Sequence, residues 1–247
     1  MDTQSGNFTT SVTDVTVAGV GDTDLEVTRS YNSLAAFGTG GGTTRFTESG
    51  GEVQQEEIAG PPHPFGRAWT FDYAVRLLVV DNLLMQGAQV FYPDGRVISF
   101  RREGSGFAPI TPFSHDELVA VGSAYELRHK ATLVSEVFDT EGHLIQHRDR
   151  NGNTITLTYN GDQLAKAENA SGRVITFDYN GDGYISAIHA PESKDLFYAY
   201  TDGDLTSVTD ARGNTTAYHY DGNHQLTEIT TPESHPHLRM KLSLIHI

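Results

Sequence analysis

Residue types that could support chemistry gather in the second half of the chain. Asp178, Asn180 and Asp182 alternate before Gly183, as in the first half of a calcium-binding loop, where oxygens at positions 1, 3 and 5 surround the ion. The twelfth position, where such a loop needs a bidentate Glu, is His189. The pattern therefore favours a polar turn over a calcium site, and we expect no metal ligand here.

Histidines and carboxylates give no diagnostic spacing either. His235 and His237, with His219 and His224 nearby, lack a third ligand at a spacing typical of zinc sites. Almost every Asp falls in an expected turn, where its side chain can accept hydrogen bonds from local backbone amides. A glycosidase needs two carboxyl groups at a defined separation, and the sequence singles out no such pair. The chain also lacks G-x-S-x-G, P-loop and Rossmann motifs, so we expect a protein that is not an enzyme and carries no cofactor.

Composition excludes further classes of function. The 247 residues include 17 Lys and Arg against 32 Asp and Glu, a net charge of -15 that argues against nucleic acid as a partner. The lack of Cys removes disulfides, Cys-ligated zinc and thiol nucleophiles. The longest aliphatic run, 77–80, is far shorter than the roughly 20 residues that span a bilayer. We therefore expect no membrane span, and the first residues carry no export-signal pattern.

An internal repeat organises the second half of the chain. Large aromatic residues recur at intervals of 20 or 21 residues, each followed by a short polar turn and then an aliphatic residue. The aromatic positions are Phe138, Tyr159, Tyr179, Tyr200 and Tyr220, and the aliphatic positions are Leu144, Leu164, Ile185, Leu205 and Leu226. A second turn lies midway and is centred on Gly152, Gly172 or Gly213. Each unit is expected to be two short strands and two turns.

Alternation of apolar and polar residues ahead of each aromatic position predicts the strands. Ile155, Leu157 and Tyr159 would share one face, with threonines on the other. Stacked units would align their large side chains as ladders that stabilise the sheet, so we expect the tyrosines to serve packing. A platform that stacks sugars is the alternative for the same ladder. In the third unit, Pro191 interrupts the midway turn, which predicts a longer loop at a sheet edge or bulge.

The residues before the repeats have a different sequence pattern. Residues 1–74 predict a β-rich N-terminal domain, because Thr and Val alternate within residues 8–33. Within this domain the Gly-rich acidic stretch 36–60 predicts a mobile loop. Residues 75–137 carry strand-like patches, including a hairpin around the Pro-Asp-Gly turn at 93–95. Residues 114–121 are the best candidate for a short helix. The fold class expected is all-β, an antiparallel repeat sheet preceded by a β-rich domain.

The repeats resemble a known family. DRNGNTITLTY at 149–159 and LTSVTDARGNTTAYHYD at 205–221 closely resemble the YD repeats of Rhs proteins, of bacterial toxin-complex C components and of animal teneurins. Residues 5–33 and 65–77 resemble the domain that precedes these repeats in bacterial Rhs proteins. The literal Tyr-Asp pair occurs only at 220–221, and Asn or Thr follows the tyrosine in the other units.

The resemblance implies a spiralling β-shell that encloses a C-terminal polymorphic toxin used in competition between cells. This chain would supply the N-terminal domain, the leading hairpins at 75–137 and the YD repeats at 138–232 of that secreted or cell-surface shell. Its partners would be the remainder of the same polypeptide, namely further repeats and the toxin, with secretion-system components or glycans as further candidates. A cell-surface carbohydrate-binding or adhesion module is the alternative.

The last residues are expected to be a truncated end. Residues 233–247 leave the repeat pattern, and LSLIHI at 242–247 resembles one reading frame of a sequencing adapter. We therefore expect the final six residues to be an artefact and not part of the natural protein.

Overall fold

A computed structural model describes residues 7–36, 43–49, 52–58, 63–81, 86–104, 106–110, 115–232 and 240–241. Within these ranges the regular structure is β-strand, apart from two short 3-10 helices, η1 (Ser33–Ala36) and η2 (Pro191–Ser193). None of the described helices has the length and apolar character needed to cross a membrane. The expected all-β fold is confirmed.

The N-terminal residues form a small sheet of their own. Strands β1 (Thr9–Val17), β2 (Leu25–Asn32) and β5 (Trp69–Phe71) pair antiparallel in the order β1-β2-β5, and we call them the N-terminal sheet. Alternate residues of β2 are buried, which is the period-2 pattern of a strand with one covered face.

The stretch 36–60, expected as a loop, contains a two-stranded hairpin instead. Strands β3 (Thr43–Ser49) and β4 (Glu52–Ile58) pair antiparallel along their full length. Their innermost paired residues are Ser49 and Glu52. The loop expected over the whole stretch is therefore wrong for residues 43–49 and 52–58, which are strands.

The remaining strands form one closed sheet, which we call the repeat sheet. Consecutive strands along the chain pair antiparallel throughout it. Its strands are β6 (Arg76–Asp81), β7 (Gln86–Phe91), β8 (Val97–Glu103), β9 (Gly106–Pro109), β10 (Glu117–Val121), β11 (Ala124–His129), β12 (Val134–Phe138), β13 (Leu144–Arg148), β14 (Thr154–Asn160), β15 (Gln163–Glu168), β16 (Val174–Tyr179), β17 (Ile185–His189), β18 (Leu196–Thr201), β19 (Asp204–Thr209), β20 (Thr215–Tyr220), β21 (Leu226–Thr230) and β22 (Met240–Lys241).

Two predictions for residues 75–137 have opposite outcomes. The Pro-Asp-Gly hairpin is confirmed, because β7 and β8 pair on either side of it. The short helix at 114–121 is wrong: residue 114 lies outside the described residues, and Glu117–Val121 form β10, which pairs with β11 and contacts β9. Leu118 is fully buried in that strand, so pairing on both sides decides the structure of a segment too short to hold a helix on its own.

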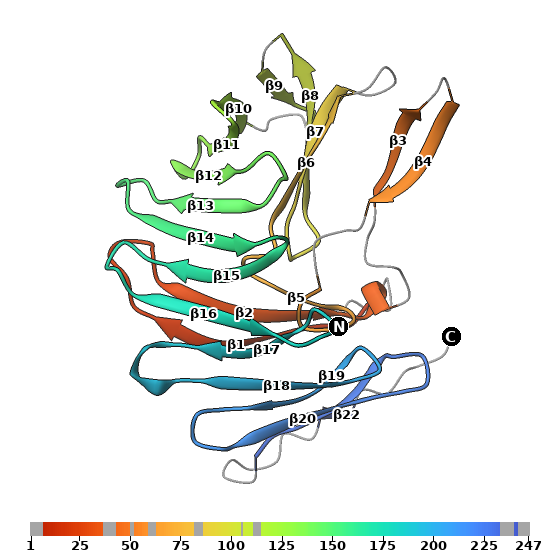
Figure 1. Ribbon diagram of the computed structural model, residues 1–247, viewed down its shortest axis with the longest axis vertical. Helices are drawn as coiled ribbons and strands as arrows, with labels where there is room; N and C mark the ends of the chain where they lie inside the picture. The colour runs from red at the N-terminus through yellow and green to blue at the C-terminus, as the bar shows by residue number, and fades with distance from the viewer. Residues whose placement is uncertain are drawn as a thin grey trace.

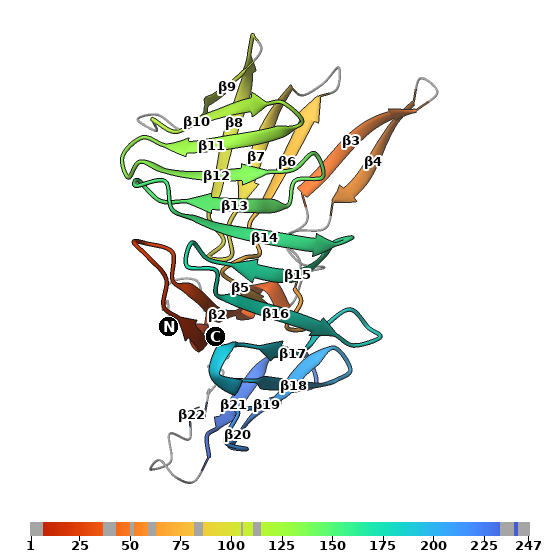
Figure 2. The ribbon, with the colours of Figure 1, turned by 60° about the vertical axis from the view of Figure 1, so that its left-hand side comes forward.

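The repeat sheet curves back on itself. Strands β6 to β9 (Figure 2) lie behind β10 to β15, and the N-terminal sheet lies behind β15 and β16. An antiparallel bridge joins Arg76, at the start of β6, to His143, just before β13. Beside it, the Leu77 amide donates to the Gly142 carbonyl at 2.9 Å. We call this contact between β6 and the turn 139–143 the closure.

Six turns of the repeat sheet share one pattern of hydrogen bonds. Each begins with Asp or Asn, whose side-chain oxygen accepts the backbone N–H groups two and four residues later. The first residues of these turns are Asp139, Asp149, Asn169, Asn180, Asp210 and Asp221. Local side chains therefore satisfy the amides at the strand ends, as Asx turns do generally.

The fourth residue of each of these turns has a positive φ. The structure places Gly152, Gly172 and Gly213 at this position, and His224 occupies it in the turn 221–225. The third unit departs from the pattern, because its loop at 190–195 contains η2 and is one residue longer than the turn 149–153. The longer loop predicted from Pro191 is present.

Figure 1 shows how the chain runs through these elements. The strands from β12 to β20 are stacked one after another, with the turns lined up at both ends of the strands. Of the predicted end segment 233–247, the structure describes only β22. The adapter-like hexapeptide 242–247 lies outside the described residues.

Replacing Gly142 with Ala should destabilise the sheet more than the same change at Gly213. Both glycines have a φ above 80°, where Ala costs about 1–2 kcal/mol. A Cβ at position 142 would lie 1.9 Å from the Leu77 carbonyl oxygen, whereas a Cβ at position 213 meets nothing within 4 Å. Urea denaturation of Gly142→Ala and Gly213→Ala measures the two losses. Equal losses would show that the closure adds no constraint.

Candidate functional site

The predicted aromatic and aliphatic residues face each other across each hairpin. The cross-strand pairs are Phe138 with Leu144, Tyr159 with Leu164, Tyr179 with Ile185, Tyr200 with Leu205, and Tyr220 with Leu226. In all five strand pairs the register shifts by a β-bulge directly before the aromatic residue. The aliphatic members and Phe138 are buried, and the four tyrosines are partly buried against the core.

Three of these tyrosines also tie neighbouring units together through their hydroxyl groups. Each hydroxyl donates a hydrogen bond to the backbone carbonyl of the aliphatic residue in the preceding unit. The bonds run from Tyr179 to Leu164 (3.1 Å), from Tyr200 to Ile185 (2.7 Å) and from Tyr220 to Leu205 (2.9 Å). Burial raises the pKa of each of these tyrosines, so the hydroxyls keep their protons and remain donors.

A buried charge lies where the N-terminal sheet meets the repeat sheet. Arg29 occupies the buried face of β2, and its side chain is 1% exposed. Its Nε and Nη2 donate to the two carboxylate oxygens of Asp14, which lies at a β-bulge in β1 and is 4% exposed. Burial alone would lower the pKa of Arg29, but the Asp14 carboxylate holds it well above its ordinary value.

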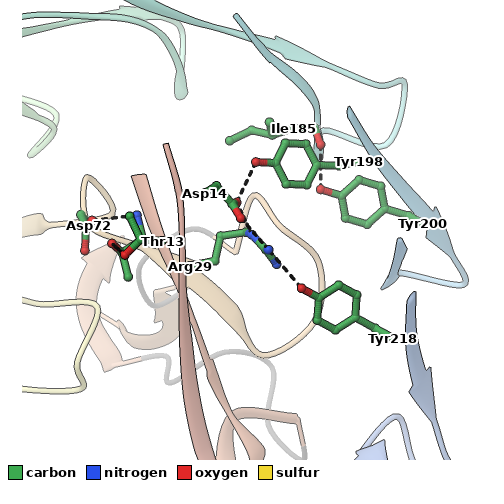
Figure 3. Close-up of polar contacts among 9 residues, drawn as sticks. Thr13, Asp14, Arg29, Asp72, Ile185, Tyr198, Tyr200 and Tyr218 are labelled. Atoms are coloured by element: carbon green, nitrogen blue, oxygen red, sulfur yellow. Dashed lines mark hydrogen bonds and ion pairs between the residues drawn. The ribbon is translucent and has the colours of Figure 1, made fainter. Parts of the chain in front are cut away.

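The repeat sheet completes the surroundings of this ion pair (Figure 3). The Tyr198 hydroxyl donates to Asp14 Oδ2 at 2.7 Å, and Arg29 Nη2 donates to the Tyr218 hydroxyl at 3.2 Å. Four aromatic rings surround the guanidinium carbon at 5.0–5.8 Å, those of Phe65, Trp69, Tyr198 and Tyr218. Ion pairing and cation–π contacts together compensate the loss of water around the buried cation. We call these residues the Arg29 cluster.

Further hydrogen bonds attach the N-terminal residues to both ends of the repeat strands. At one end, the bonds run from Ile185 N to Pro64 O (2.7 Å), Arg67 N to Gly203 O (2.8 Å), Trp69 Nε1 to Tyr220 Oη (2.9 Å) and Leu226 N to Tyr31 Oη (3.0 Å). At the other end they run from Asn169 Nδ2 to Ala18 O (3.1 Å) and from Asp22 N to Asp149 Oδ2 (3.3 Å). Asp149 also accepts bonds from Asn153, the main reason that its pKa is lowered to about 2.

A cavity of about 200 Å³ lies between the N-terminal residues and the turns of the repeat sheet. Its polar lining includes His63, Arg76, His143 and Asp162. Burial lowers the pKa of His63, which favours its neutral form. The ligand atoms of Asp139, Glu141 and His143 come within 4.8 Å of one another, but both ring nitrogens of His143 are already within hydrogen-bond distance of carboxylates. In the structure these hydrogen bonds join His143 to Asp139 and Asp162.

The segment that resembles a calcium loop forms a polar turn. Asn180 Oδ1 accepts the amides of Asp182 and Tyr184, and Asp178 lies 3.1 Å from His189 Nε2. His224 Nδ1 lies 2.8 Å from Asp204 Oδ2, and His219 lies on the exposed side of β20. His235 and His237 lie outside the described residues.

Sequence reasoning missed the Arg29 cluster. One signal was present, because Arg29 follows Leu25 and Val27 in period 2 and so puts a charge on an otherwise apolar face. The partners of Arg29 gave no comparable signal, since Tyr198 and Tyr218 are remote in sequence.

Replacing Arg29 with Met should cost about 3–5 kcal/mol of unfolding free energy, because Asp14 would remain buried without its partner. Lys166→Met is the control: its ion pair with Glu168 is 2.8 Å long, but both side chains are about 40% exposed, so the loss should stay below about 1 kcal/mol. Urea denaturation compares the two variants. Similar losses would show that the Arg29 cluster contributes no more than a surface pair.

Replacing Tyr200 with Phe should cost about 1 kcal/mol, because the ring still packs but the hydrogen bond to the Ile185 carbonyl is lost. Thermal or urea unfolding of the variant measures this loss. An unchanged unfolding free energy would mean that the hydroxyl ladder is not a stabilising element.

Comparison with known proteins agrees with this architecture. The family model described as RHS Repeat matches residues 200–235, which contain β19 to β21. A second model, for a domain of unknown function (DUF6531), matches residues 1–100, which contain the N-terminal sheet and the first strands of the repeat sheet. No curated protein matches the chain.

Among solved structures, the crystal structure of TcdB2-TccC3-Cdc42 is similar over 92% of this chain, at 11% sequence identity and a TM-score of 0.35. This chain spans only 14% of the length of that one. The match to the RHS Repeat model lies within the repeat sheet, in the part of the chain where the recurring unit ends in β20 and β21.

Proposed function

We propose that this chain forms the opening part of a β-shell that encloses a C-terminal toxin segment of the same polypeptide. The chain would act by enclosure and not by catalysis. The observation that carries the proposal is the Arg29 cluster, which holds the N-terminal sheet against one face of a curved repeat sheet through buried contacts. A curved wall of this kind, if extended by further repeats, would separate the space that it encloses from solvent.

The repeat unit supports growth of such a wall by simple addition. Each unit satisfies its own turn amides through Asp or Asn, and its tyrosine bonds to the unit before it. Repeat proteins built from nearest-neighbour contacts can lengthen without changing their units. Further repeats in the same polypeptide would therefore extend this sheet into a longer wall.

In this proposal the N-terminal sheet plugs the start of the wall. Its contacts reach the turns at both ends of the repeat strands, so one small sheet crosses the width of the larger one. Strands at the edge of an open sheet invite pairing with other chains, and a sheet closed at β6 exposes less of that edge. The protein would act as a secreted or cell-surface shell in competition between cells.

The packing of the tyrosines supports the wall over a sugar-stacking platform. Their rings lie against the core, and three of their hydroxyls are committed to backbone carbonyls. A glycan would need these faces and hydroxyls to be open. The adhesion alternative is therefore left as an outcome of the test.

The proposal is tested by limited proteolysis of a longer polypeptide, in which this chain is followed by the C-terminal segment that the proposal requires. We expect the C-terminal segment to resist protease while the wall is folded, and to be cut once Arg29→Met loosens the N-terminal sheet. Lys166→Met, which leaves the Arg29 cluster intact, should keep the protection. Mass spectrometry of the fragments identifies the protected segment.

The proposal would be overturned if the C-terminal segment were cut as fast as an unfolded reference while the wall stayed intact. Selective binding in a glycan array by the same polypeptide, together with an unprotected C-terminal segment, would support the adhesion module instead.

A further inference from the structure

The repeat sheet carries three Asn-Gly pairs, each at one of its turns. They are Asn151-Gly152, Asn160-Gly161 and Asn180-Gly181. Glycine lacks a Cβ, so its backbone nitrogen can come close to the side-chain amide of the residue before it. That nitrogen can then attack the Cγ carbon of the asparagine. The three pairs therefore place the same two reacting groups in three different surroundings.

The attack has a simple chemical balance. A bond forms between the glycine nitrogen and Cγ of the asparagine, and the bond between Cγ and Nδ2 breaks. The glycine amide proton leaves with Nδ2 as ammonia, and a cyclic succinimide remains. Water, the only co-reactant, then opens this ring at one of its two carbonyls. One opening gives aspartate, and the other gives isoaspartate, in which the main chain runs through Cγ and gains a carbon atom.

Both reacting groups of the second pair are open. Asn160 ends β14 and pairs across the hairpin with Gln163, so the turn between them consists only of Gly161 and Asp162. Asn160 and both turn residues are exposed, and a Cβ at position 161 would meet nothing within 4 Å. Within the described part of the chain, neither the Asn160 side chain nor the Gly161 amide forms a hydrogen bond that must break before the attack.

In the first pair, the attacking nitrogen is occupied. The Gly152 amide donates to the Asp149 carbonyl at 3.1 Å, inside the turn 149–153. This hydrogen bond directs the nitrogen toward the start of the turn. Gly152 must leave that bond before its nitrogen can attack Cγ of Asn151.

In the third pair, the side chain under attack is held instead. Asn180 Oδ1 accepts the amides of Asp182 at 3.0 Å and of Tyr184 at 2.9 Å. These two bonds turn the side chain toward the residues that follow it, as in Asx turns generally. The side chain must leave both bonds before its Cγ comes within reach of the Gly181 nitrogen.

We propose that Asn160 is a site of spontaneous deamidation, at which the folded chain converts to aspartate and isoaspartate, and that hydrogen bonds in the turns protect Asn151 and Asn180. This modification is a property of the folded sheet itself and does not depend on the proposed cargo.

Isoaspartate at position 160 would disturb the closure, because Asp162 reaches the closure from the same turn. Asp162 Oδ1 lies 2.8 Å from His143 Nε2, in the turn 139–143, and 3.5 Å from Arg76 Nη2, at the start of β6. A turn of only two residues fixes the register of its hairpin, so an extra main-chain atom moves Asp162 away from both partners. Aspartate at position 160 keeps the original chain length and leaves Asp162 in place.

Peptide mapping by mass spectrometry tests the order of the three rates. The full chain is kept folded in mildly basic buffer, and the conversion of asparagine to aspartate and isoaspartate is followed at each pair. Each hydrogen bond that must break should slow the attack about fivefold, so we expect conversion about fivefold slower at Asn151 and about 25-fold slower at Asn180 than at Asn160. In concentrated urea the pairs lose these surroundings, and their rates should become similar.

The effect on the closure is measured at the Leu77 amide, which donates to the Gly142 carbonyl at 2.9 Å. Chromatography separates the isoaspartate form from the treated chain. We expect the hydrogen-exchange protection factor of Leu77 in this form to be about fivefold lower than in the untreated chain, the factor for one lost hydrogen bond. Asn160→Asp is the matched control: it adds the same charge without the extra atom, and it should keep the protection of the untreated chain.

Three rate patterns would overturn the site. The first is conversion at Asn151 or Asn180 as fast as at Asn160 in the folded chain. The second is an order of rates that persists unchanged in urea, and the third is no conversion at Asn160 in the folded chain while the chain in urea converts. All three are measured on the wild-type chain, so they stand whether or not a variant folds. Equal protection of Leu77 in the isoaspartate form and in Asn160→Asp would overturn the effect on the closure.

Discussion

A buried positive charge sets the relation between the two main parts of this protein. Arg29 has lost almost all contact with water, so every alternative position of β2 against the repeat sheet would leave its charge without Asp14 or without the hydroxyls of Tyr198 and Tyr218. Such a pair adds little net stability compared with an apolar core, but it penalises wrong arrangements strongly. The Arg29 cluster therefore specifies where the N-terminal sheet sits, and the hydrogen bonds at both ends of the repeat strands follow from that position.

The repeat sheet itself depends on contacts of shorter range. Each Asp or Asn at the start of a turn satisfies two backbone amides within five residues, so a hairpin can complete its own end without help from elsewhere. The tyrosine hydroxyls then join one unit to the one before it. Local turns and nearest-neighbour bonds together explain why a motif of about 20 residues is sufficient to build a continuous sheet.

This division explains what could be predicted from the sequence. The aromatic spacing and the Gly-centred turns are local and periodic, and they gave the strands and the turn positions. The hairpin at 43–58 and strand β10 were misjudged because a Gly-rich composition and a possible cap were weighed without their strand partners. The Arg29 cluster joins residues up to 189 positions apart, and no pattern within one segment records such a contact. A lone Arg on an apolar strand face was the one sequence signal for the Arg29 cluster.

The acidic residues of the chain differ in how their interactions respond to pH. Where a carboxylate accepts hydrogen bonds from an Asn side chain and from backbone amides, as Asp149 and Asp210 do, its pKa is lowered and the turn is insensitive to neutral pH. Where carboxylates face an imidazole, as at His129, the interaction changes within the neutral range. Arg29 stays charged across the same range, since its pKa is held above its ordinary value. The ion pair that docks the N-terminal sheet therefore keeps its charge over the range in which the contacts of His129 change.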